Sequence, residues 1–137
     1  MAAASPEFVA SHFARGVGAR TLAAAPSLVF SRKDRLQARW VRRLCHRSVE
    51  TPRHWLPSPQ AFVDAALAGM GWGMHPVSLI ADALRDGSLV ELVPGSGLPV
   101  PLYWQQARAA PQLLLALRTA VRSASRSGPH ALTDSVA

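Results

Sequence analysis

Helices along the chain are predicted from start signals that are followed by periodic apolar positions. In Ser5-Pro6-Glu7 and again in Ser58-Pro59, a hydroxyl cap precedes a proline at the first helical position, where a missing N–H has no consequence. Further along, Leu36, Trp40 and Leu44 recur every fourth residue, which predicts one apolar helix face with arginines on the other. The helices expected in this way cover residues 5–16, 21–24, 34–46, 58–69, 76–86 and 111–126.

Short apolar or alternating runs between these helices predict strands. Leu89-Val90-Glu91-Leu92-Val93 alternates, whereas Ser27-Leu28-Val29-Phe30 is a continuous run suited to a buried strand. The expected strands cover residues 27–30, 53–56, 70–75 and 89–93, with one more centred on 102–104. Because strand and helix alternate, the sequence predicts an α/β fold in which helices flank a central, mostly parallel sheet.

Neither end of the chain carries a predicted strand. Met1-Ala2-Ala3-Ala4 leads directly into the first helix start, without the basic leader and apolar core of a secretory signal. Residues 127–137 are small and polar, and we expect them to form a disordered tail. No apolar run approaches the ~20 residues of a membrane span. The sequence therefore favours a cytoplasmic protein with no membrane association.

The length and composition indicate one compact domain with a strong positive charge. The chain has 137 residues, of which 49% are hydrophobic, and a formal net charge of +7. All of its cations except Lys33 are arginines, and seven cations lie within residues 32–47. Such a cluster can contact phosphates, but the segment lacks a helix-turn-helix signature and interleaved exposed aromatics. A solvated helix face is the favoured interpretation, and nucleic-acid binding is the alternative.

Catalytic and metal chemistry have little support. Cys45 is the only cysteine, which excludes an internal disulfide and a multi-cysteine metal site, and the adjacent His46 points in another direction on a helix. The chain has no HExxH motif and no phosphate-cradling glycine loop, and Gly71-Trp72-Gly73 lacks the third glycine of a dinucleotide fingerprint. The sequence predicts no enzyme, no cofactor and no metal.

Several tracts in a fixed order resemble the effector-binding domain of LysR-type transcriptional regulators. They are the capped helix start at 57–62, the strand-to-helix turn at 68–76, the turn and strand at 86–92, and Leu102-Tyr103-Trp104 before the last helix. Residues 4–8 and 25–34 are similar to the arginine- and lysine-responsive subgroup, the ArgP and LysG regulators of basic amino-acid export. The resemblance covers almost the whole chain, to about Arg126.

This resemblance implies a periplasmic-binding-protein-like domain of two lobes. Residues 1–126 would form a partial effector domain, in which about 5–100 build the second lobe and 101–126 supply the return strand and closing helix of an incomplete first lobe. The winged helix-turn-helix, the linker and most of the first lobe would be missing. The implied partners are a small-molecule effector, arginine or lysine, and further copies in a homo-oligomer, with DNA bound only through the missing winged helix.

The resemblance places the effector in the cleft between the lobes, and helix N-termini suit the carboxylate of an amino acid. The candidate effector-binding residues are Phe30, Ser31, Ser58, Gln60, Met74 and His75. Each has a plainer explanation as well, because Ser58 can simply cap its helix and His75 can be a structural histidine. Asp34 and Asp64 are weak candidates for a carboxylate partner, since capping and solvent exposure explain them. Two other functions stay open, namely a small basic nucleic-acid-binding protein and an inactive truncated remnant.

Overall fold

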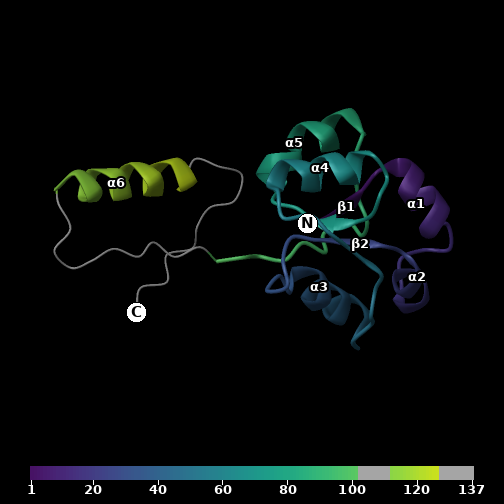
Figure 1. Cartoon of the computed structure of the whole chain (residues 1–137). Helices are drawn as coiled ribbons and strands as arrows, with labels where there is room; N and C mark the ends of the chain where they lie inside the picture. The colour runs from purple at the N-terminus through teal and green to yellow at the C-terminus, as the bar shows by residue number, and fades with distance from the viewer. Residues whose placement is uncertain (102–111, 127–137) are drawn as a thin grey trace. The chain divides into compact units, whose positions relative to one another are not determined.

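The structure, a computed structural model, describes residues 1–101 and 112–126, and the chain divides into two units, Met1–Leu98 and Pro99–Ala137 (Figure 1). In the first unit the elements follow one another as β1 (Ala2–Ala4), α1 (Pro6–His12), α2 (Ala19–Ala24), β2 (Ser27–Val29), α3 (Leu36–Cys45), β3 (Arg53–Trp55), α4 (Pro59–Leu67), β4 (Gly73–Met74), α5 (Val77–Asp86) and β5 (Val90–Glu91). The described part of the second unit contains α6 (Gln112–Arg126).

Strands β3, β2 and β4 run side by side in the same direction. β2 pairs in parallel with β3. On its other side the backbone N–H of Leu28 donates to the carbonyl of Trp72, directly before β4, and a parallel bridge joins Ser27 to Trp72. β1 is antiparallel to both of its neighbours, β4 and β5. The predicted α/β fold is confirmed, and its strands form a two-stranded parallel sheet, β2-β3, and a three-stranded antiparallel sheet, β4-β1-β5, joined by the bridge between Ser27 and Trp72.

Strand β1 is the element that the sequence analysis missed. Ala2, Ala3 and Ala4 are completely buried and form the centre of the order β4-β1-β5. Alanine has a low preference for strands, and three alanines show no alternation that could reveal one. The small side chains suit this place, because helices cover both faces of the sheet here.

The predicted hydroxyl caps of α1 and α4 are confirmed. The hydroxyl oxygen of Ser5 accepts a hydrogen bond from the N–H of Phe8, and that of Ser58 accepts one from the N–H of Ala61. At the start of α3 the N-cap is Arg35 rather than Asp34, although a carboxylate oxygen of Asp34 accepts a hydrogen bond from the N–H of Leu36. These side chains satisfy backbone donors that have no partner inside a helix.

Several predicted bounds are wrong. Helix α1 ends at His12 rather than near residue 16, and α2 begins at Ala19 rather than at residue 21. The strands expected over 70–75 and 89–93 shrink to β4 and β5, which have two residues each. Apolar runs indicate burial, but only pairing with a neighbouring strand decides where a strand ends. The strand centred on 102–104 and the tail of 127–137 lie outside the described residues.

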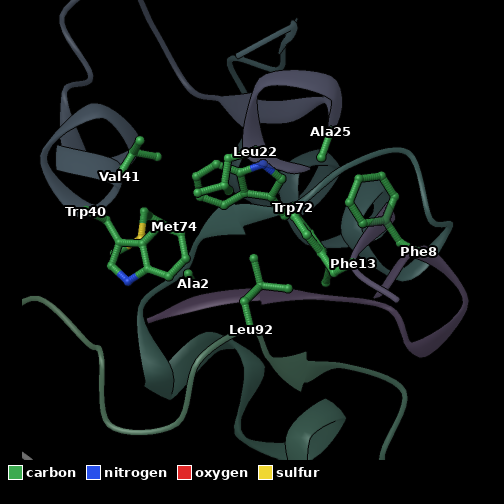
Figure 2. Close-up of a cluster of buried hydrophobic side chains, with 11 residues drawn as sticks. Ala2, Phe8, Phe13, Leu22, Ala25, Trp40, Val41, Trp72, Met74 and Leu92 are labelled. Carbon is green, nitrogen blue, oxygen red and sulfur yellow. The ribbon is translucent and has the colours of Figure 1, made fainter. Parts of the chain in front are cut away.

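Two hydrophobic clusters cover opposite faces of the sheet, and the alternation of β1 links them. Figure 2 shows the larger cluster, to which Ala2 and Ala4 contribute together with helices α1, α2 and α3. Ala3 points into the smaller cluster, which holds Phe62 of α4 and Ile80 of α5. In Figure 1, α4 and α5 accordingly lie on one side of the strands, and α2 and α3 on the other. The predicted layers of helix, sheet and helix are confirmed.

Helix α6 belongs to the second unit and is described by itself. Its leucine and valine stripe recurs at helical spacing, and Leu114, Leu117 and Val121 are exposed. In the described residues, no helix is both long enough and apolar enough to cross a lipid bilayer.

Candidate functional site

The carboxyl ends of β2, β3 and β4 meet at one edge of the sheet, because these three strands are parallel neighbours. Phe30-Ser31 follows β2, residues 56–58 follow β3, and His75-Pro76 follows β4. The N–H of Leu56 donates to the carbonyl of Val29, so the first two segments are directly joined. We call this region the carboxyl edge. It brings together chain segments that the sequence predicts to face an effector.

Phe30 and Ser31 form the turn between β2 and α3. The ring of Phe30 is partly exposed, and its backbone N–H donates to a carboxylate oxygen of Asp34 at 3.3 Å. The half-buried Ser31 accepts through its hydroxyl oxygen from the N–H of Lys33. A serine hydroxyl that accepts in a turn still has a proton to donate, so Ser31 can bind a ligand without loss of the turn.

Ser58 and Gln60 lie at the start of α4 and are exposed. The side chain of Ser58 caps the helix by accepting from the N–H of Ala61 at 3.4 Å. The side-chain amide of Gln60 donates to Asp64 one turn further along, at 2.9 Å. The capping explanation for Ser58 is therefore correct. The helix start still carries backbone N–H groups and a partial positive charge that favour an anion.

Met74 and His75 lie deeper than the other four candidates. Met74 is 7% exposed and belongs to the larger hydrophobic cluster, and His75 is 3% exposed. The imidazole ring of His75 packs edge-on against Phe62 of α4, with 4.9 Å between ring centres. Within residues 1–101 and 112–126, neither ring nitrogen has a hydrogen-bond partner. Both residues support the carboxyl edge from beneath.

Burial lowers the pKa of His75 to about 4, and the positive charge of the Met1 ammonium group adds to this effect. Imidazole is thus neutral at physiological pH in the folded protein. The neutral ring therefore adds no charge beside Phe62 of α4.

Glycine at position 73 is required by the close approach of α4 to β4. A Cβ atom there would lie 2.7 Å from one ring carbon of Phe62 and 3.0 Å from Nε2 of His75. Gly71 is similarly close, since its Cβ would lie 2.9 Å from the carbonyl oxygen of Pro26. Glycine at positions 71 and 73 therefore permits close packing of the neighbouring elements.

Replacement of Gly73 by alanine is expected to lower the free energy of unfolding by about 1–3 kcal/mol, because the added methyl group overpacks the space between α4 and β4. Urea denaturation followed by circular dichroism measures this loss. Gly18 offers a matched control, since a Cβ there meets nothing within 4 Å. Equal losses for Gly73→Ala and Gly18→Ala would show that the close approach is unimportant.

Sequence reasoning missed a shallow pocket between α3 and the strands β2 and β3. Its volume is about 50 Å³, and Arg32, Arg35, Gln37, Arg53 and Trp55 contribute to its wall. The side-chain amide of Gln37 donates to the carbonyl of Leu28 at 2.7 Å. A glutamine among the buried positions of α3 was the available sequence signal, because buried amides need partners.

Metal and nucleophile chemistry find no support in the described ranges. They contain no group of three or more histidine, cysteine, aspartate or glutamate side chains that could hold a metal ion. Cys45 is a half-buried free thiol at the end of α3.

Comparison with known proteins agrees with this picture. A family model for the LysR substrate binding domain matches residues 1–126. The regulator ArgP of Pseudomonas aeruginosa strain UCBPP-PA14 is 43% identical over 116 residues, which are 83% of this chain and 38% of that protein. This chain thus spans about two fifths of the length of that relative.

Two solved structures resemble the chain. The C-terminal domains of a LysR family protein from Agrobacterium tumefaciens strain C58 superpose with a TM-score of 0.90 at 49% identity, over 96% of this chain and 63% of that one. Full-length LysG from Corynebacterium glutamicum with bound effector Arg superposes with a TM-score of 0.70 at 31% identity, over 88% of this chain and 41% of that one. The periplasmic-binding-protein-like α/β fold is that of LysR effector-binding domains. The chain belongs to the LysR substrate-binding domain family.

Proposed function

We propose that this chain is the effector-sensing part of a LysR-type transcriptional regulator, and that its effector is arginine or lysine. The observation that carries the proposal is the carboxyl edge, where three parallel strands end beside the start of α4. The similarity to ArgP, and to a LysG with bound effector Arg, supports the choice of a basic amino acid.

The carboxyl edge fits the carboxylate of an amino acid better than its cationic side chain. Helix α4 offers backbone N–H groups and the hydroxyl of Ser58, and the turn after β2 offers the hydroxyl of Ser31. Arg32 and Lys33 increase the positive charge nearby. Asp34 is already engaged, because its two oxygens accept from backbone N–H groups of Phe30 and Leu36. The carboxylates that bind the ligand's cation therefore come from outside this edge.

In the proposed regulator, residues of about 5–100 form the second lobe and 101–126 contribute to the first. Ligand binding closes the lobes and changes the arrangement of subunits in a homo-oligomer, which repositions DNA-binding domains of the parent protein. ArgP of Pseudomonas aeruginosa is named an HTH-type regulator and is longer than this chain, which supports such a parent. The alternative of direct nucleic-acid binding by residues 32–47 predicts salt-dependent binding to unrelated DNA and no response to arginine or lysine.

Thermal unfolding in the presence of amino acids tests the effector. Millimolar L-arginine or L-lysine is expected to raise the melting temperature by several degrees, because a ligand at about 100 times its Kd stabilises the folded state by about 2.7 kcal/mol. The neutral analogues L-citrulline and L-norleucine are expected to give a smaller shift, since they share the α-carboxylate that the carboxyl edge binds but lack the side-chain cation.

Two variants test whether the rise in melting temperature depends on the carboxyl edge. Ser58→Ala is expected to reduce the shift relative to the variant's own melting temperature without ligand. Ser48→Ala changes an exposed serine away from the carboxyl edge and is expected to leave the ligand-induced shift in melting temperature unchanged. Equal shifts with arginine and citrulline, or no shift with either basic amino acid, would contradict the proposed effector.

A further inference from the structure

Gln37 is a buried polar residue of α3 that the proposed function does not use. It is 5% exposed, and its side-chain amide nitrogen donates to the carbonyl of Leu28 at 2.7 Å. The same nitrogen donates to a carboxylate oxygen of Asp34 at 3.3 Å. The amide oxygen is buried and has no hydrogen-bond partner among the described parts of the chain. Gln37 therefore acts as a donor alone, although a buried acceptor without a partner is destabilising.

The hydrogen bond from Gln37 replaces strand pairing at the end of β2. Leu28 donates from its N–H to the carbonyl of Trp72, directly before β4. In an extended strand the N–H and the carbonyl of one residue point to the same side, so the carbonyl of Leu28 also faces β4. This carbonyl accepts from the amide of Gln37, which takes the place of a backbone N–H of the neighbouring strand. On this side, the chain after β2 is therefore held by α3.

Asp34 connects the same amide to the turn that follows β2. One of its carboxylate oxygens accepts from the backbone N–H of Phe30 and from Gln37, each at 3.3 Å. The other oxygen accepts from the N–H of Leu36 at 3.0 Å. Hydrogen bonds to an ionised carboxylate are stronger than those between neutral groups. One half-buried side chain thus ties the turn to the first residues of α3.

Ser31 belongs to this turn and follows Phe30 directly. Its hydroxyl oxygen accepts from the N–H of Lys33, which leaves the hydroxyl proton for a ligand. The turn lies close to the start of α4, because Val29 accepts from the N–H of Leu56. A hydrogen bond weakens steeply when its length or angle changes. The position of the turn therefore decides whether Ser31 can reach a carboxylate that binds at the start of α4.

We propose that Asp34 and Gln37 are positioning residues of the effector site, which hold the turn so that the hydroxyl of Ser31 meets the α-carboxylate of the ligand. They act through Ser31, because Gln37 is buried and both oxygens of Asp34 already accept from the protein. This inference rests on the proposed function and adds the residues that shape its carboxylate contact.

Isothermal titration calorimetry of the complete chain with L-arginine and L-argininamide tests this role. The two ligands differ only at the α-carboxylate, which L-argininamide replaces with a neutral amide, so the parent is expected to prefer L-arginine. In Asp34→Asn one side-chain oxygen still accepts from Leu36, but an N–H donor replaces the oxygen that faces Phe30 and Gln37. We expect the Kd for L-arginine to rise by at least about tenfold and that for L-argininamide by less than about threefold.

Gln37→Leu removes both donors with little change in volume. It eliminates one acceptor without a partner, the amide oxygen, and creates another at the carbonyl of Leu28. The melting temperature without ligand is therefore expected to stay within a few degrees of the parent. The preference for L-arginine over L-argininamide is expected to fall as in Asp34→Asn. A purely structural role would instead lower the melting temperature and leave this preference intact.

Phe8→Leu is the control for a loss of stability away from the site. Phe8 is 3% exposed and lies in α1, which follows β1 at the opposite edge of the sheet because β1 runs antiparallel to β4. This variant is expected to melt at a lower temperature and to keep the ligand preference of the parent. Circular dichroism verifies that each variant is folded at the temperature of the titration.

The outcomes separate this inference from the proposed function. A parent chain that binds neither L-arginine nor L-lysine contradicts the proposed function and, with it, the positioning role. A parent that prefers L-arginine, together with folded Asp34→Asn and Gln37→Leu variants of unchanged preference, contradicts the inference alone. Equal losses of affinity for L-arginine and L-argininamide in these variants would also overturn it, because the carboxylate contact would then not depend on Asp34 and Gln37.

Discussion

Replacement of Trp40 by alanine is expected to lower the free energy of unfolding by about 3–5 kcal/mol, the largest effect of any single change considered for this chain. Trp40 is 1% exposed, and its ring centre lies 5.2 Å from that of Trp72 in the larger cluster (Figure 2). Its indole N–H donates to the carbonyl and the hydroxyl oxygen of Ser96, at 3.1 and 3.0 Å. Alanine would remove this packing and leave a cavity between α3 and the sheet.

Two further variants separate the contribution of buried packing from that of the hydrogen bond to Ser96, and urea denaturation measures their stability. Trp40→Phe retains an aromatic ring but removes the donor to Ser96, and we expect a smaller loss than for alanine. Trp55→Ala removes a tryptophan of the same size from a half-exposed position, with an expected effect within about 1 kcal/mol. If Trp40→Ala lowers the free energy of unfolding as little as Trp55→Ala does, the buried and packed position of Trp40 in the core is contradicted.

Acidification from pH 6.5 to about 4 is expected to remove about 3 kcal/mol of unfolding free energy through His75 alone. Burial lowers the pKa of His75 from 6.5 to about 4. Above pH 6.5 the imidazole is neutral in both states and contributes no pH dependence. Between 6.5 and about 4 the unfolded chain binds a proton that the folded chain excludes, so the unfolded state is favoured.

The variant His75→Leu isolates this contribution, because it removes the titrating ring and keeps the position apolar. Unfolding free energies of parent and variant are measured across this pH interval, and their difference cancels the titration of the other residues. The difference is expected to change by about 3 kcal/mol in favour of the variant as the pH falls. A difference that stays constant over the interval would show that His75 is accessible to protons in the folded state.

Local features of the candidate site follow from the sequence, whereas the burial of its residues does not. Ser58 caps α4 as its position before Pro59 indicates, because capping involves residues only three apart. Met74 and His75 were grouped with Phe30 and Ser58, but they are buried at 7% and 3% exposure. Their depth follows from contacts with Phe62 and with β1, which are distant in sequence.

The sequence by itself determined where helices begin, which faces of them are apolar and in what order strands alternate with helices. Hydroxyl caps, prolines and apolar periodicity act over a few residues, so they can be seen in the chain directly. Only the tertiary structure decided that Ala2–Ala4 is a central strand and that the ends of β2, β3 and β4 share one edge. Ala2 pairs with Met74 across more than half of the chain, and such pairing depends on shape and hydrogen bonding between whole elements rather than on any local pattern.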